Sequence, residues 1–245
     1  MERKNEINKI IKDKIDNEYK ERILSCAEDG ENISLAYDGI VDEECFYCKG
    51  SKKILFLLKD PNGKNDYADG NGHIDEDLYN TAIATEETEN ERTKLILTYR
   101  NVCMFTKIIE DPNFELEDCW TSKKGFAVDE MRGFLKHIAV VNIRKSVGSG
   151  NCSNKKIKTA VEEYYALIKE EIDIIKPSIV VCGGIFDFIK NNYQSEIKHL
   201  VNGARYFIYN NCIYLEYYHP GARFGYEKHF NVFKRTYDEL CHELK

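Results

Sequence analysis

Three short apolar runs constrain the fold of this chain most strongly. Residues 54–58 read Ile-Leu-Phe-Leu-Leu, an uninterrupted apolar run typical of a strand that is covered on both faces. Similar runs at 138–141 and 178–182 each follow a stretch with helical periodicity. Strands that alternate with helices favour a parallel sheet with helices on both of its faces. The sequence therefore predicts an α/β fold.

The other predicted elements fit this architecture. Residues 205–209 and 213–217 flank two asparagines, and we interpret them as a pair of strands joined by a turn. The predicted helices cover about residues 77–109, 129–136, 158–175 and 227–244, with one or two more between residues 2 and 27. A chain of 245 residues commonly forms one domain. We expect a single domain over 1–245, with an N-terminal helical extension over 1–50 and an insertion over about 64–125.

Composition excludes several classes of protein. The chain is 42% hydrophobic and 31% charged, with 15 Gly and 4 Pro, so it is neither collagen-like nor wholly disordered. No segment approaches the roughly 20 apolar residues of a membrane span. The N-terminus also lacks the hydrophobic region of a signal peptide. We therefore expect a cytoplasmic protein with no membrane partner.

Charge and cysteine content add two further expectations. The balance of 35 Lys and Arg against 42 Asp and Glu gives a net charge of −7, which lacks the overall basic signature of a nucleic-acid binder but leaves room for a local basic patch. The 9 cysteines are an odd number spread over a long chain. We expect most of them to be buried thiols without disulfide bonds.

Chemically capable residues follow the predicted strands. Asp60, Asn142, Gly183 and His219 each stand at or just beyond a strand end. In open α/β sheets, ligands bind beyond the carboxyl ends of the strands. We therefore expect a cleft that combines a carboxylate, an amide and an imidazole, with glycine allowing a ligand to approach the backbone.

Four segments carry a resemblance to a known family. Residues 58–63 read Leu-Lys-Asp-Pro-Asn-Gly, 140–143 read Val-Val-Asn-Ile, 177–184 read Pro-Ser-Ile-Val-Val-Cys-Gly-Gly, and 219–223 read His-Pro-Gly-Ala-Arg. In order and rough spacing they resemble the motifs of the uracil-DNA glycosylase superfamily, over about residues 54–235. The resemblance implies a three-layer α/β/α sandwich with a central, mostly parallel four-stranded sheet. It also implies hydrolysis of the N-glycosidic bond of uracil or a related deaminated base in DNA, as in base excision repair.

The resemblance implies roles for the residues at the strand ends. An ionised Asp60 would stabilise positive charge on the sugar and orient a water molecule, and a neutral His219 would donate a hydrogen bond to the departing base. Asn142 would read the imide edge of uracil with the donor and acceptor of its amide. The remaining base-binding candidates are Asn62, Tyr67 and Gly183.

The partner implied by the resemblance is DNA that contains a damaged base, bound by a monomer. Arg223, four residues after His219, stands where the superfamily inserts a side chain into the space vacated by the extruded base. Arg144 and Lys145 begin a basic cluster directly after Asn142. Such a cluster is predicted to contact DNA phosphates, although a solvated loop would have the same composition.

The chain departs from the family pattern in two motifs. Lys59 replaces a residue of the small, glycine-containing pair that precedes the catalytic position, so its charge would lower the pKa of Asp60 or its side chain would close the pocket. Gly221 replaces the serine of the last motif, which would remove a hydroxyl contact to a DNA phosphate.

Cysteine positions argue against a cofactor. Some branches of the superfamily hold an iron-sulfur cluster on four cysteines, and Cys45 and Cys48 match the first half of that pattern. Ser146 occupies the third position, and Cys152 would supply only one further ligand. Because a cluster needs four ligands, we expect no iron-sulfur cluster and no other metal.

Other interpretations of these residues remain open. Asp60 before a proline is typical of a turn, Asn142 of a side chain that satisfies loose backbone groups, and His219 of a strand-ending turn. The acidic segment 66–91 and the net charge favour a pocket for a free nucleoside or nucleotide. The altered motifs favour a non-catalytic interaction protein on the same fold.

Overall fold

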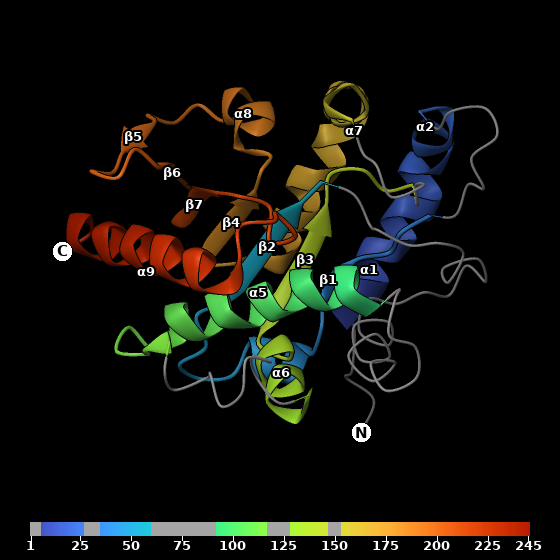
Figure 1. Cartoon of the computed structure of the whole chain (residues 1–245). Helices are drawn as coiled ribbons and strands as arrows, with labels where there is room; N and C mark the ends of the chain where they lie inside the picture. Colours follow the sequence, from blue (N-terminus) through green and yellow to red (C-terminus); the bar gives the residue numbers. More distant parts are fainter. Residues whose placement is uncertain (1–5, 27–34, 60–91, 117–127, 147–152) are drawn as a thin grey trace.

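A seven-stranded sheet forms the centre of the protein. The computed structural model describes residues 6–26, 35–59, 92–116, 128–146 and 153–245. Within these residues the sheet has the order β1-β3-β2-β4-β7-β6-β5 (Figure 1). The strands are β1 (Gly39–Ile40), β2 (Ile54–Leu58), β3 (Ile138–Asn142), β4 (Ile179–Gly183), β5 (Lys198–His199), β6 (Arg205–Tyr209) and β7 (Cys212–Tyr217).

The four central strands run parallel, and the edges are antiparallel. β2 pairs in parallel with β3 and with β4, and β4 pairs in parallel with β7. β1, β6 and β5 join in antiparallel pairs. The predicted α/β class is confirmed, but the described sheet is larger than the four strands expected. Two of the additional strands, β1 and β5, have 2 residues each and are too short to leave a pattern in the sequence.

The predicted strand pair is a hairpin. Tyr209 pairs with Cys212 across β6 and β7, which leaves Asn210 and Asn211 as the loop. Both asparagines have positive φ angles, 49° and 61°, as two-residue hairpin turns require. Asparagine tolerates this conformation better than most residues, so the turn is encoded locally.

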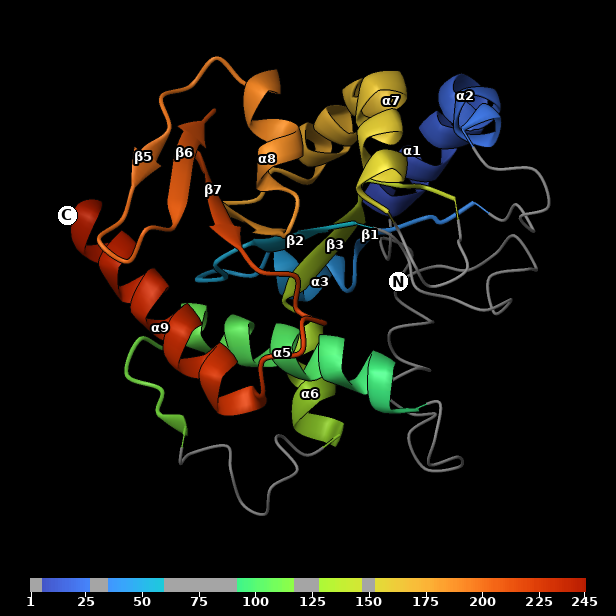
Figure 2. The ribbon, with the colours of Figure 1, turned by 45° about the horizontal axis from the view of Figure 1, so that its top comes forward.

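Helices cover both faces of the sheet. They are α1 (Glu6–Lys14), α2 (Lys20–Ser25), α3 (Glu43–Phe46), α5 (Arg92–Glu110), α6 (Val128–Leu135), α7 (Asn154–Ile175), α8 (Phe186–Ile189) and α9 (Tyr226–Glu243). Helices α5, α6 and α9 pack on one face, and α1, α7 and α8 pack on the other (Figure 2). Along β2, alternate side chains enter the two cores, with Phe56 on the α5 side and Leu57 on the α7 side. This double burial explains the uninterrupted apolar run.

Local signals fix the ends of α7. The Ser153 hydroxyl accepts a hydrogen bond from the Lys156 backbone N–H at 3.3 Å, so the helix begins at Asn154, earlier than predicted. Lys176, with a φ of 52°, ends it in the left-handed conformation. The helix then leads into β4, as expected for a strand–helix–strand unit.

The N-terminal helices pack on the body of the protein. α1 and α2 are joined by a π-helical turn (Ile15–Tyr19), and Ile11, Ile15 and Ile23 enter the same core as α7. The predicted insertion falls largely outside the described residues, apart from α5 and the turn after it. No helix in the described part of the chain is long and apolar enough to cross a membrane.

Candidate functional site

Three neighbouring strands end around His219. β4 lies between β2 and β7, so the carboxyl ends of these parallel strands are adjacent. The Gly184 backbone N–H donates to the Tyr217 carbonyl at 2.8 Å, which joins the ends of β4 and β7. A Cβ atom on Gly184 would lie 3.4 Å from Lys59 Cε and 3.6 Å from His219 Cβ. The side chains of Lys59 and His219 therefore both lie beside this glycine.

The hydrogen bonding of His219 fixes its tautomer. Its Nδ1 accepts a hydrogen bond from the Gly221 backbone N–H at 3.0 Å, so the neutral ring carries its proton on Nε2. Burial, and secondly the positive charge of Lys59, lower the pKa of His219 from 6.5 to about 4. Within the described residues, the hydrogen bond to Nδ1 is the one found for this ring, and none is found for Nε2. At neutral pH, His219 is therefore an uncharged donor whose Nε2–H is available to a ligand.

Two fully buried side chains fix the segment that carries His219. Asn101 on α5 donates through Nδ2 to the Pro220 carbonyl at 2.6 Å. Nε2 of His229 on α9 lies 2.8 Å from the Ala222 carbonyl oxygen. A carbonyl oxygen can only accept a hydrogen bond, so Nε2 is the donor. The position of His219 is therefore set by α5 and α9 together.

Gly221 has no room for a side chain. A Cβ atom at this position would lie 2.8 Å from Thr98 Oγ1 on α5 and 3.2 Å from His219 Nδ1. The close packing of α5 thus explains why glycine stands at this position.

We expect Gly221→Ala to lower the free energy of unfolding by about 1–3 kcal/mol, because the new methyl group forces its neighbours to move. Urea unfolding measures this change. Thr98→Ala combined with Gly221→Ala should recover part of the loss, since the shorter contact is with Thr98. Gly133→Ala is the control, because nothing lies within 4 Å of a Cβ there. Equal stability of Gly221→Ala and wild type would contradict the crowding argument.

Gly183 is also required by packing. A Cβ atom on Gly183 would lie 2.7 Å from Leu58 Cδ2 and 3.1 Å from Pro220 Cδ. Protein atoms therefore fill the space beside this glycine, which lets the end of β4 approach both β2 and the His219 segment.

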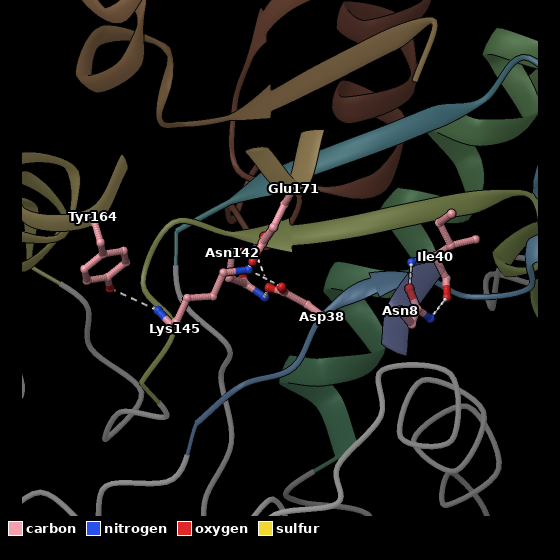
Figure 3. A network of polar contacts seen from close by, with 7 residues as sticks. All are labelled: Asn8, Asp38, Ile40, Asn142, Lys145, Tyr164 and Glu171. Atoms are coloured by element: carbon pink, nitrogen blue, oxygen red, sulfur yellow. Dashed lines mark hydrogen bonds and ion pairs between the residues drawn. The ribbon is translucent and has the colours of Figure 1, made fainter. Parts of the chain in front are cut away.

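Asn142 is held by a carboxylate. Its backbone N–H and its Nδ2 both donate to Asp38 Oδ2, at 2.5 Å and 3.1 Å (Figure 3). Asp38 directly precedes β1, the edge strand beside β3. The Asn142 amide is buried, and the carboxylate sets which way it faces.

Lys145 lies inside the protein between two acids. Its Nζ forms ion pairs with Asp38 Oδ1 and, at 2.6 Å, with Glu171 Oε2 on α7 (Figure 3). Burial alone would lower the pKa of Lys145, but the two carboxylates outweigh it and raise the pKa. Burial raises the pKa of Glu171 to about 8. Because this ammonium group is fully enclosed, it has no access to a DNA phosphate, contrary to the role predicted for it.

The other predicted residues are distributed as follows. Arg144 is buried, with its backbone N–H donating to the Lys59 carbonyl at 3.0 Å, so it does not form the exposed basic cluster expected. Arg223 is exposed in the segment between β7 and α9. Asp60, Asn62 and Tyr67 lie outside the described residues. The structure thus brings Gly183, His219 and Asn142 to the same edge of the sheet, with Asn142 two strands from Gly183.

Sequence reasoning missed the residues that support the site. Asn101 contacts a residue 119 positions away, and Asp38 contacts Lys145 from 107 positions away. No local pattern marks such contacts. The exposed aromatic residues Tyr218 and Phe224 beside His219 were visible in the sequence but were indistinguishable from ordinary strand and loop residues.

The described cysteines are free thiols. Cys45 and Cys48 lie in and just after α3, with Cys45 partly buried and Cys48 exposed. Cys152 lies outside the described residues. Within the part of the chain that the structure describes, no group of three or more His, Cys, Asp and Glu side chains could hold a metal ion.

Comparison with known proteins gives no relative from which a function could be transferred. No family model matches the chain. No curated protein matches it either. Its function has to be inferred from the site itself.

Proposed function

We propose that this protein is a DNA glycosylase that hydrolyses the N-glycosidic bond of uracil or a related deaminated base. The observation that carries the proposal is the state of His219. A neutral imidazole with its proton on Nε2 and no described partner there is the kind of donor that stabilises negative charge on a departing base. Its fixed position means that little reorganisation is needed during the reaction.

The reaction balances with water as the only co-reactant. The bond between the sugar C1′ and the base nitrogen breaks, and its electron pair stays on the base. Water adds to C1′ and gives its proton to the carboxylate expected at Asp60, which also faces the sugar cation. The base anion, hydrogen-bonded to His219, then takes a proton from solvent.

The surface beside His219 supports a polynucleotide substrate. Tyr218 and Phe224 are 53% and 37% exposed, and their rings meet edge to face with centroids 4.7 Å apart. Lys228 Nζ lies 5.2 Å from the Phe224 ring centroid. Arg223, which directly precedes Phe224 in the chain, is exposed. Exposed aromatic rings with adjacent cations suit stacked bases and their phosphates.

The arrangement of the sheet supports the proposal as well. The four segments of the resemblance include or follow β2, β3, β4 and β7, which are the four parallel strands. Their carboxyl ends therefore share one edge, where ligands bind in open α/β sheets.

Excision assays test the proposed function. Single- and double-stranded oligonucleotides with one uracil, hypoxanthine or xanthine are incubated with excess protein, and abasic sites are revealed by alkaline cleavage. We expect cleavage of at least one damaged substrate and none of the matched undamaged strands. Intact oligonucleotides throughout would contradict the proposal.

The second candidate is a pocket for a free nucleoside or nucleotide, which the net charge of −7 favours because acidic surface repels DNA. The salt dependence of binding separates the two. Affinity for DNA falls steeply with salt because many phosphate contacts release counterions. Binding of a nucleoside, which has no phosphate, changes little, and binding of a mononucleotide falls less steeply than that of DNA.

A further inference from the structure

Lys59 is a half-buried cation for which no ion pair is found among the described residues. It follows β2 directly, and its side chain lies beside Gly184, where a Cβ atom would be 3.4 Å from Cε. Its positive charge reaches His219, since it contributes to the lowered pKa of that imidazole.

Other half-buried lysines of the described structure have a partner for their charge, either a carboxylate or an aromatic ring. The half-buried Lys14, Lys107 and Lys190 pair with acids at 2.6 to 3.5 Å. Lys12, Lys53 and Lys169 lie 4.7 to 5.6 Å from the centroids of tyrosine rings. A charge that is partly removed from water is costly unless it is compensated. The uncompensated charge of Lys59 therefore points to a negatively charged group that arrives with the ligand.

We infer that Lys59 is a second catalytic residue, whose ammonium group stabilises the negative charge of the departing base next to the hydrogen bond from His219. This inference rests on the proposed function, because it assigns the charge that Lys59 meets to the leaving base. Lys59 also opposes protonation of His219, so at neutral pH the departing base would meet one cation and one neutral donor.

The step adds no reactant to the hydrolysis. The electron pair of the broken C1′–N bond stays on the base as a delocalised anion. Lys59 neutralises this anion as an ion pair without giving up a proton, and His219 keeps its Nε2 proton. The interaction strengthens only as the bond breaks, so it lowers the barrier more than it strengthens substrate binding.

The placement of Lys59 is tested without any activity. The pKa of His219 is measured by NMR titration of the imidazole in wild type and in Lys59→Met. We expect the pKa to rise from about 4 toward its ordinary value, because removal of the cation favours the imidazolium ion, while burial keeps the rise partial. Lys52→Met, at the opposite end of β2, is the control and should leave it unchanged. An unchanged pKa in Lys59→Met would contradict the placement.

Binding of free bases tests the charge of the ligand. Barbiturate is a uracil analogue that has one additional oxygen on its ring and is ionised at neutral pH, and the Lys59→Met variant shows how much of its preference over uracil depends on the charge of Lys59. We expect wild type to bind barbiturate at least about 10-fold more tightly than uracil in calorimetry, and Lys59→Met to lose this preference while Lys59→Arg keeps much of it. Equal affinity of wild type for the two bases would overturn the inference.

Single-turnover excision distinguishes catalysis from phosphate binding. We expect Lys59→Met to slow excision by about 10- to 100-fold with little change in DNA affinity or its salt dependence. A loss of affinity with a shallower salt slope would instead assign Lys59 to a phosphate and contradict the catalytic role. Barbiturate binding that depends on Lys59, in a protein that excises no base, would refute the proposed function and leave the anion site standing.

Discussion

His219→Ala is expected to lower the single-turnover rate of base excision by about 100-fold or more, with DNA affinity nearly unchanged. The variant removes the Nε2–H donor. In wild type the ring is oriented by the hydrogen bond from the Gly221 N–H to Nδ1, and its segment is fixed by the hydrogen bonds from Asn101 and His229. A donor to the departing base acts mainly in the transition state, so its loss affects the rate rather than binding. Quenched-flow excision and fluorescence anisotropy measure the two quantities separately.

Two comparisons make this result specific. His199→Ala removes an exposed imidazole from β5, away from the site, and should leave the rate unchanged. Asp60→Asn should also slow excision by about 100-fold or more, because it removes the negative charge expected opposite the sugar cation. A wild-type rate in His219→Ala would show that the imidazole is only part of a turn.

The parallel core was predictable because its signals are local. β2 buries all of its side chains, so its apolar run is visible without knowledge of its neighbours. In an α/β fold the direction of the strands then determines which residues share an edge, which is why Gly183 and His219 could be placed together. The two-residue edge strands carry no comparable signal.

The surroundings of the site could not be predicted, since they depend on distant contacts. A lysine and an arginine after a strand are typical of a solvated basic loop, yet Lys145 and Arg144 are buried. Lys145 is buried because Asp38, before β1, and Glu171, on α7, converge on it. Neither acid stands out in the sequence. The same network holds Asn142, whose contact with Asp38 spans 104 residues.

This network leads to the second large effect. Lys145→Met should lower the free energy of unfolding by about 3–5 kcal/mol, since it leaves two buried acids without their cation. Methionine has similar length and no charge, so the loss reports electrostatics more than packing. Lys158→Met, on the exposed face of α7, is the control and should change stability by less than about 0.5 kcal/mol. Urea unfolding with matched m-values measures both variants.

The pH dependence of the Lys145→Met deficit identifies its cause. Burial raises the pKa of Glu171 to about 8 in the wild-type protein, and loss of the neighbouring cation raises it further. A carboxyl group with a raised folded-state pKa contributes most to stability when it is protonated, below its unfolded pKa, and this contribution is lost as pH rises through the folded pKa. Glu171 is protonated in both proteins below about pH 8, so the deficit should be nearly constant from pH 5 to pH 7 and should grow as pH rises above about 8, where only wild type can ionise Glu171 beside a cation. Glu171→Gln in the Lys145→Met background should abolish this growth above pH 8, because glutamine has no proton to lose. A deficit that does not grow between pH 7 and pH 10 would assign the loss to packing and not to Glu171.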